Sequence, residues 1–327
     1  VLRGGSFLND AEDCRIAARR ASNPVYGYVN IGFRSVIEAE VPPAGMTRYV
    51  DDDSVDPQPP YTNAAHAAVT IQDAVDASGT NDLILVAAGL YNTGGRTAGF
   101  GLTNRVVIDR PVTVRGVDGP RETVIEGAGP AGDSAVRCVH LGDGAVLEGF
   151  TLTNGHTRTR GYLYHDMSGG GVYGAEGAVV SNCLIFGNAA EADGAGVYGC
   201  MLFDCEIAGN TIDGGVGGDG AGAADCTLVR CYLHHNDSSD DAGGIFRSRA
   251  TACVIVSNTA FASGGAAVAS SLRDCLIVDN GADYSGGGTL NCTNVNCTIL
   301  GGDAFVGGGV YGGALTNSIV WNNRALL

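Results

Sequence analysis

The second half of the chain repeats one short pattern at intervals of about 22 residues. From Gly169 onward, each copy has a glycine-rich stretch, then a cysteine or serine, an apolar residue two positions later and usually an asparagine five positions later. The marked residues are separated by 22, 26, 22, 22, 22 and 21 residues and are Cys183, Cys205, Cys231, Cys253, Cys275, Cys297 and Ser318. The asparagines are Asn188, Asn210, Asn236, Asn258, Asn280 and Asn323, and Gly302 interrupts the series. Such regularity indicates that each copy is one turn of a solenoid.

The repeat is built from strands and turns rather than from helices. Apolar residues alternate, as at Leu276 and Val278, whereas a helix needs apolar spacings of three and four. Glycine in every copy would also cost a helix about 1 kcal/mol per site. Neighbouring coils would stack roughly 4.8 Å apart, so that equivalent residues lie above one another. The sequence therefore predicts an all-β fold, a parallel β-helix of about eleven coils and roughly 50 Å in length.

The repeated residues predict two kinds of internal column. We expect each asparagine to adopt the left-handed conformation at a tight bend and to hydrogen-bond to the asparagine of the next coil. We expect the cysteines to be small inward-facing residues, since Ser318 takes the same place. A second small-residue column holds Ala178, Cys200, Cys226, Ser248, Ser270, Cys292 and Gly313. No clustered histidine accompanies these cysteines, so packing is favoured over metal binding, and individual disulfides stay open.

Composition excludes several classes of function. The 327 residues carry a net charge of −16, and all 19 basic residues are arginine. An acidic chain is a poor partner for nucleic acid, and no lysine is present to act as a nucleophile or base. No apolar run is long enough to span a membrane.

Residues 1–37 lie outside the repeat. They contain Leu-Arg-Gly-Gly-Ser-Phe at 2–7, Cys14-Arg15, and Asn-Ile-Gly-Phe-Arg at 30–34. This order resembles the C-terminal end of the formylglycine-generating-enzyme family, which has a C-type-lectin-like fold. Catalytic members carry two cysteines in this stretch, whereas this chain has Cys14 at the later position and Asn9 at the earlier one. The resemblance therefore does not imply sulfatase activation, and we expect the chain to be a fragment or a processed product.

The remaining sequence predicts a linker over residues 38–63, a capping helix over 64–78 and the β-helix over 79–327. The string Val-Ile-Asp-Arg-Pro-Val-Thr-Val-Arg-Gly occurs at 107–116, and Gly-Gly-Gly-Val-Tyr-Gly occurs at 169–174 and 307–312. These segments resemble the right-handed parallel β-helix repeat proteins of environmental bacteria and are similar to polymorphic outer-membrane-protein repeats. The resemblance and the usual twist of parallel crossovers imply a right-handed helix. The resemblance also implies an extracellular or cell-surface protein of bacterial origin.

Two interruptions of the repeat hold residues suited to ligand binding. Arginines beside tyrosines suit an acidic sugar, because guanidinium pairs with a carboxylate and the ring stacks on the sugar. The first cluster, a candidate glycan site, consists of His156, Arg158, Arg160, Tyr162, Tyr164, His165 and Asp166. The second consists of His234, His235, Asp237, Asp240, Asp241, Arg247 and Arg249. Each could equally be solvated loop, and the repeat shows no aspartates aligned over successive coils, as a pectin-type hydrolase would need.

These observations leave three hypotheses of function. The leading one is a non-enzymatic structural or adhesive solenoid whose partner is itself, assembling head to tail into a filament because coil ends are strand templates. The alternatives are an acidic-polysaccharide lyase or hydrolase and a carbohydrate-binding module without catalysis. No cofactor is expected, apart from weak calcium binding at Asp51–Asp53 and Asp56.

Overall fold

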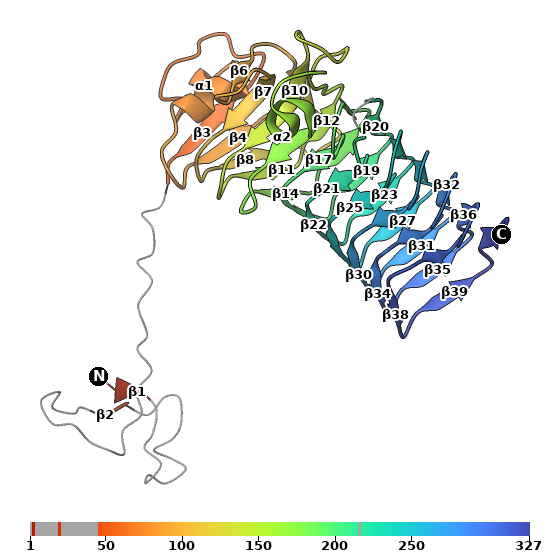
Figure 1. Ribbon diagram of the computed structural model, residues 1–327. Coiled ribbons are helices and arrows are strands. Elements are labelled where there is room, and N and C mark those ends of the chain that lie inside the picture. Colours follow the sequence, from red (N-terminus) through yellow and green to blue (C-terminus); the bar gives the residue numbers. More distant parts are fainter. Residues whose placement is uncertain (1, 4–18, 21–44, 215–216) are drawn as a thin grey trace, which may run out of the picture. The chain divides into compact units, whose positions relative to one another are not determined.

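The structure, a computed structural model, describes residues 2–3, 19–20, 45–214 and 217–327, and it divides into two units, Val1–Pro43 and Ala44–Leu327 (Figure 1). In the first unit, β1 (Leu2–Arg3) pairs antiparallel with β2 (Arg19–Arg20). The remainder of the segment that resembles the formylglycine-generating-enzyme family lies outside the described residues.

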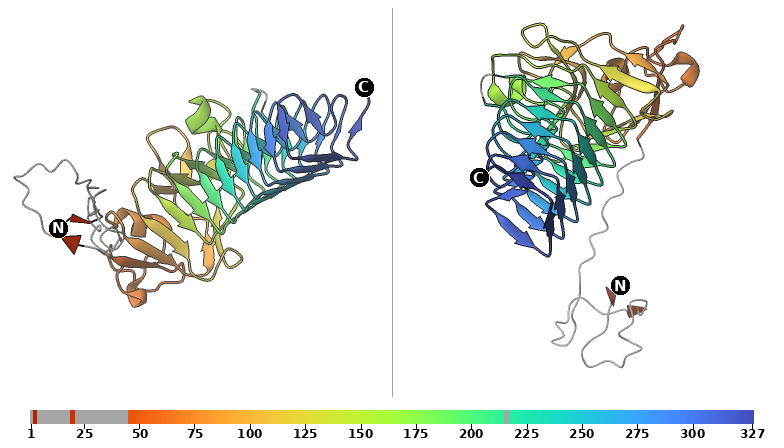
Figure 2. Two further views of the ribbon diagram at one scale, coloured as in Figure 1. Left: turned by 90° about the horizontal axis from the view of Figure 1, so that it is seen from below. Right: turned by 90° about the vertical axis from the view of Figure 1, so that its right-hand side faces the viewer.

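The second unit is a right-handed parallel β-helix, as predicted, with strands gathered into four sheets that run along its length (Figure 2). We call the sheets S1 to S4 in the order in which a full coil visits them. S1 has eleven strands, so the solenoid has the predicted eleven coils.

The strands of S1 are β3 (Thr47–Val50), β4 (Leu83–Val86), β8 (Thr113–Gly116), β11 (Val146–Glu148), β14 (Val179–Ser181), β18 (Met201–Phe203), β22 (Thr227–Val229), β26 (Arg249–Thr251), β30 (Ser271–Arg273), β34 (Thr293–Val295) and β38 (Ala314–Thr316). Those of S2 are β5 (Gly89–Tyr91), β9 (Thr123–Glu126), β12 (Thr151–Thr153), β15 (Leu184–Phe186), β19 (Glu206–Ala208), β23 (Tyr232–His234), β27 (Val254–Val256), β31 (Leu276–Val278), β35 (Thr298–Leu300) and β39 (Ile319–Trp321).

S3 consists of β16 (Ala189–Ala190), β20 (Thr211–Ile212), β24 (Asp237–Ser238), β28 (Thr259–Ala260), β32 (Gly281–Ala282), β36 (Asp303–Ala304) and β40 (Arg324–Ala325). S4 consists of β6 (Arg96–Thr97), β7 (Thr103–Ile108), β10 (Val136–Leu141), β13 (Val172–Gly174), β17 (Val197–Tyr198), β21 (Ala223–Ala224), β25 (Ile245–Phe246), β29 (Ala267–Val268), β33 (Thr289–Leu290) and β37 (Val310–Tyr311). All the pairings are parallel except that of β6 with β7.

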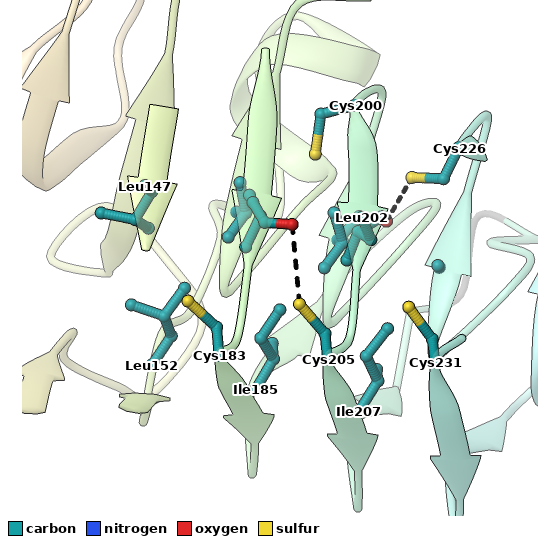
Figure 3. Close-up of a cluster of buried hydrophobic side chains, with 14 of the residues drawn as sticks. Leu147, Leu152, Cys183, Ile185, Cys200, Leu202, Cys205, Ile207, Cys226 and Cys231 are labelled. Carbon is teal, nitrogen blue, oxygen red and sulfur yellow. Dashed lines mark hydrogen bonds between the residues drawn. The ribbon is translucent and has the colours of Figure 1, made fainter. Parts of the chain in front are cut away.

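The core is a stack of inward-facing residues, apolar in most strands, with the buried Asn294 as the inward residue of β34. The central residue of each three-residue strand points inward, so that Ile185, Ile207 and Leu233 lie above one another and are fully buried. The sulfur atoms of Cys183, Cys205 and Cys231 form a parallel file beside them (Figure 3). Inward-facing residues recur at every second position within a strand and at about every 22 positions between coils. These two spacings together specify the register of every sheet.

Three of the four corners of a full coil use one residue in the left-handed conformation, followed directly by a column residue. Asp204 (φ 54°) precedes Cys205, Arg247 (φ 44°) precedes Ser248, and His235 (φ 54°) precedes Asn236. The prediction that the column asparagines themselves are left-handed is wrong, because none of them has a positive φ. The preceding residue makes the bend, which leaves the asparagine side chain free to point inward.

The asparagine side chains form a hydrogen-bonded ladder through five coils. Each Nδ2 donates to the Oδ1 of the next coil's asparagine at 2.8–3.0 Å, from Asn188 to Asn280. Each Oδ1 also accepts the backbone N–H of the preceding column asparagine, at 2.9–3.1 Å. The ladder therefore satisfies buried backbone groups that no strand pairs.

The cysteines and serines have a common role at two other corners. The Cys205 thiol donates to the carbonyl of Phe203 at 3.3 Å, and the Ser248 hydroxyl donates to that of Phe246 at 2.7 Å. Ser248 Oγ also accepts the backbone N–H of Cys226, at 3.0 Å. All ten described cysteines are buried and free of disulfides, and the described residues contain no group of three or more His, Cys, Asp or Glu placed to hold a metal.

The N-terminal coils differ from expectation in two respects. Strand β3 lies within the segment expected to be a linker, so S1 begins before the predicted capping helix. That helix is divided into a 3₁₀ turn, η1 (Ala64–His66), and α1 (Ile71–Asp76). The break arises because Ala68 pairs with Val50 as a β-bridge, after which Thr70 caps α1. No helix in the described part of the chain is long and apolar enough to cross a membrane.

Sheet S3 begins only at β16. In the earlier coils, two buried arginines donate hydrogen bonds to backbone carbonyl groups instead. Arg105 donates to the carbonyls of Gly94, Glu126 and Gly127. Arg137 is 1% exposed and donates to Asn104 Oδ1 and to the carbonyls of His165, Ser168 and Gly169. The planar guanidinium reaches several acceptors at once, which a lysine ammonium does less well.

Replacing Asn236 with alanine should lower the free energy of unfolding by about 3 kcal/mol. The substitution removes four buried hydrogen bonds, two to Asn210 and one each to Ile207 and Asn258. Urea denaturation measures the change. Cys231→Ser in the same coil is the matched control and should cost less than about 1 kcal/mol, because a hydroxyl supplies the same donor and acceptor. Equal losses for both variants would contradict the role assigned to the ladder.

Candidate functional site

The first predicted cluster lies on the loop that carries α2 (Leu163–Met167), over the outer face of S4. Its two arginines are already paired, since Arg158 and Arg160 both bind the carboxylate of Asp133. Hydrogen bonds from Arg160 and Arg158 lower the pKa of Asp133 to about 2. Asp166 is buried, and its Oδ1 and Oδ2 accept the backbone N–H groups of Leu102 and Tyr162 at 2.8 and 3.0 Å. These contacts hold the loop in place, but the two arginines share one carboxylate and the Arg160 side chain stays 74% exposed.

His165 and the two tyrosines of this cluster join an aromatic column on S4. His165 stacks on Phe100 with ring centroids 3.8 Å apart, while His156 lies apart, with Nδ1 3.1 Å from the carbonyl of Asn154. His140, Tyr173 and Tyr198 stack along the axis at 5.4 and 5.3 Å. Tyr164 stacks on Tyr198 at 5.7 Å, and Tyr162 meets Phe100 edge to face at 5.6 Å. Both faces of the Tyr198 ring are therefore covered, by Tyr173 and Tyr164, while Tyr162 and Tyr164 remain 68% and 44% exposed.

The second predicted cluster is not a single site. His234 and His235 lie at the corner of S2 and S3, where His234 Nε2 is 3.1 Å from Glu206 Oε1. Asp237 is on S3 and accepts a hydrogen bond from Thr259. Asp240 and Asp241 follow S3, whereas Arg247 and Arg249 lie at the corner of S4 and S1. Neighbours in sequence are therefore distributed around the coil.

Arg247 connects two carboxylates from earlier coils. Its Nη2 lies 2.7 Å from Asp225 Oδ2 and 2.9 Å from Asp193 Oδ2, and its guanidinium lies over the ring of Phe246. Burial alone would raise the pKa of Asp225, but hydrogen bonds from Arg247 and Tyr198 bring it below its usual value. Arg247 has a φ of 44°, which is uncommon for a residue with a long side chain. Its ion pairs with Asp193 and Asp225 offset the cost of this conformation.

Three aspartates are stacked on successive coils, contrary to the expectation that the chain has no aligned aspartates. Asp193 Oδ1 accepts the N–H of Asp219 at 3.1 Å, and Asp219 Oδ1 accepts that of Asp241 at 3.2 Å. The coil from Cys205 to Cys231 has 26 residues, and this extra length hides the alignment in the sequence. Burial, followed by the charge of Asp193, raises the pKa of Asp219 to about 7.

A groove of about 440 Å³ runs along the corner of S4 and S1 across four successive coils. We call it the corner groove, and its lining includes Glu176, Tyr198, Met201, Asp225, Thr227, Arg247 and Arg249. Arg249 and Glu176 are exposed, and neither makes an ion pair with any residue in the described ranges 45–214 and 217–327. The groove therefore offers one free guanidinium, one free carboxylate, a threonine and the edge of an aromatic ring.

Sequence reasoning found Arg247 and Arg249 but missed Glu176, Tyr198 and Thr227. These residues are far apart in sequence and meet only because equivalent corners stack. The repeat spacing does indicate that such residues meet. Met201, Thr227 and Arg249 pair in neighbouring strands of S1, at sequence spacings of 26 and 22 residues. Comparing outward positions coil by coil would have brought them together.

Comparisons with known proteins find similar solved structures but no related sequence. No family model matches the chain, and no curated protein matches it by sequence. Among solved structures, pectate lyase Pel9A is similar with a TM-score of 0.49 and 12% identity, covering 84% of this chain and 78% of that one. Pectin methylesterase PemA from Erwinia chrysanthemi has a TM-score of 0.40 and 13% identity, covering 81% and 80%. The A-module of the Azotobacter vinelandii mannuronan C-5 epimerase AlgE4 has 0.38 and 12%, covering 84% and 96%. Similarity at this level carries no argument about activity.

Asp219→Asn should stabilise the protein at pH 8 and have little effect near pH 4. The pKa of Asp219 in the folded state, about 7, is above its usual value, so folding opposes ionisation. The cost is fully present above pH 7 and is relieved as the pH falls toward the unfolded value. Because the side chain is partly exposed, we expect a gain of about 1–2 kcal/mol rather than the full conversion of the shift. Urea denaturation at both pH values measures it.

Asp204→Asn provides the control for this prediction. Asp204 pairs with Arg230 at the surface, and its hydrogen bond from Arg230 lowers the pKa of Asp204. Its replacement should therefore not stabilise the protein at pH 8. A stabilisation by Asp219→Asn that is the same at both pH values would show that the carboxylate charge is not its cause.

Proposed function

We propose that this β-helix binds a carbohydrate chain in the corner groove. The observation that carries the proposal is a long, shallow, polar groove across four coils with two unpaired charged side chains, Glu176 and Arg249. Guanidinium and carboxylate groups hydrogen-bond readily to sugar hydroxyls, and Met201 and the edge of the Tyr198 ring supply apolar surface for sugar rings. We include an extracellular location in this proposal, as the sequence predicts.

Other classes of polymer suit the groove less well. A net charge of −16 opposes nucleic acid, whose binding rests on contacts with cationic side chains. An extended peptide usually adds to a free sheet edge, whereas the strands beside the groove are paired on both sides with neighbouring coils. A lipid or apolar ligand needs an enclosed apolar pocket, and the groove is shallow and polar. A polymer rich in hydroxyl groups remains the best fit.

Cleavage of the bound glycan is a second candidate function. It is favoured by the stacked Asp193 and Asp219, because carboxyls whose pKa is raised toward neutrality are suited to general acid catalysis. Arg247, which lines the groove, contacts Asp193, and Asp219 is connected to the groove only through its hydrogen bond to Asp193. Release of new reducing ends by the wild type, and its loss in Asp219→Asn, would support this function.

The structural or adhesive role, head-to-tail assembly and calcium binding stay predictions. Asp51 and Asp52 use carboxylate oxygens to accept backbone N–H groups of Asp53 and Leu90, at 3.1 and 3.0 Å. Carbohydrate binding is compatible with an adhesive role, since a solenoid that binds glycan can attach one surface to another.

Arg249→Ala should weaken glycan binding about tenfold or more. Loss of a hydrogen bond to a charged group costs roughly 1.5–3 kcal/mol, and 1.4 kcal/mol corresponds to a factor of ten in Kd. Affinity electrophoresis in gels containing xylan, glucuronoxylan or polygalacturonate detects binding, and calorimetry on the retarding polymer gives Kd.

Arg273→Ala is the matched control. Arg273 is exposed on the next strand of S1, at the edge away from the groove, and has no ion pair with the described residues. The same change in charge should leave binding unaltered there. An equal loss in both variants would indicate a general effect of charge, and binding by neither variant nor wild type would reject the proposed function.

A further inference from the structure

The corner groove has a direction set by the register of the coils. Met201 pairs with Thr227 and Thr227 pairs with Arg249, so these side chains lie in one file parallel to the solenoid axis. Asp225 and Arg247 form a second file at the corner, each in the left-handed conformation. Because neighbouring coils are about 4.8 Å apart, four coils span roughly 14 Å from first to last. The spacing of about 4.8 Å between neighbouring coils is close to the length of one sugar unit in an extended chain.

The two ends of the groove carry opposite free charges. Glu176 lies between β13 and β14, at the end nearer the N-terminus, and Arg249 begins β26, three coils further on. Arg247 is in the same coil as Arg249, and its guanidinium is paired with Asp225 of the preceding coil and with Asp193. Among the described lining residues, the two middle coils contribute Tyr198, Met201, Asp225 and Thr227, which include no cation.

From this arrangement we infer that the ligand is a linear, largely neutral glycan that lies parallel to the axis, fits one sugar unit to each coil and places an isolated acidic group beside Arg249. The inference rests on the proposed function. A glycan with a carboxylate on every unit would place negative charge against Glu176, and only Arg249 would remain to pair with it. A ligand lying across the axis would contact one coil only.

Calorimetry with oligosaccharides of two to six units tests the inference on the full chain. The probes are xylo-oligosaccharides, the same oligomers carrying one glucuronic acid, and oligogalacturonates. We expect affinity to rise with each unit up to about four and then to level off. At four units, the singly acidic oligomers should bind several-fold more tightly than the neutral ones, and the oligogalacturonates most weakly.

Two variants assign the charges. Arg249→Gln should abolish the preference for the singly acidic oligomer over the neutral one while keeping the dependence on length. Glu176→Gln should reduce the discrimination against oligogalacturonate. Both residues are exposed, and an unchanged thermal midpoint checks that each variant is folded.

The possible results separate this inference from the proposed function. Affinity that is already complete with a disaccharide, or tightest binding of oligogalacturonate, would overturn the inference and leave carbohydrate binding standing. Absence of binding by all three series would overturn both.

Discussion

The structure depends on one local interaction, which recurs at the corners of the solenoid. A residue in the left-handed conformation turns the chain, and the next residue directs a small polar side chain inward to bond with backbone groups. At one corner this side chain is an asparagine, as in His235-Asn236, and at two others it is a cysteine or serine, as in Asp204-Cys205 and Arg247-Ser248. A buried bend would otherwise leave N–H and carbonyl groups unpaired, at a cost of about 1–3 kcal/mol each.

This interaction accounts for the frequency of cysteine in the described coils. The thiol is small, tolerates burial and bonds to the carbonyl two residues earlier, and serine occupies the same column at Ser248 and Ser270. Burial raises the pKa of the Cys138 and Cys292 thiols to about 12, which keeps them protonated at neutral pH. The cysteine columns belong to the architecture, while the candidate chemistry lies on the outer surface.

The fold could be predicted from the sequence to a larger extent than the site. Regular spacing of Cys183 to Ser318 was sufficient for the coils and columns, because stacking repeats one local solution. The helix over 64–78 was predicted too long, since pairing of Ala68 with Val50 competes with helical bonds. The arginines of the first cluster could not be recognised as paired, because Asp133 lies 25 and 27 residues earlier in another loop. The stacked aspartates were hidden by the longer coil that contains Asp219.

That longer coil shows how such a molecule can change over evolution. Its extra residues leave the strands on either side in register, as Met201, Thr227 and Arg249 demonstrate. A local insertion can therefore lengthen one turn without disturbing the other coils. The gain or loss of a whole coil would change the length of the solenoid by one coil spacing. The number of repeats therefore sets the length of such a surface, while the outward side chains of each repeat set its chemistry.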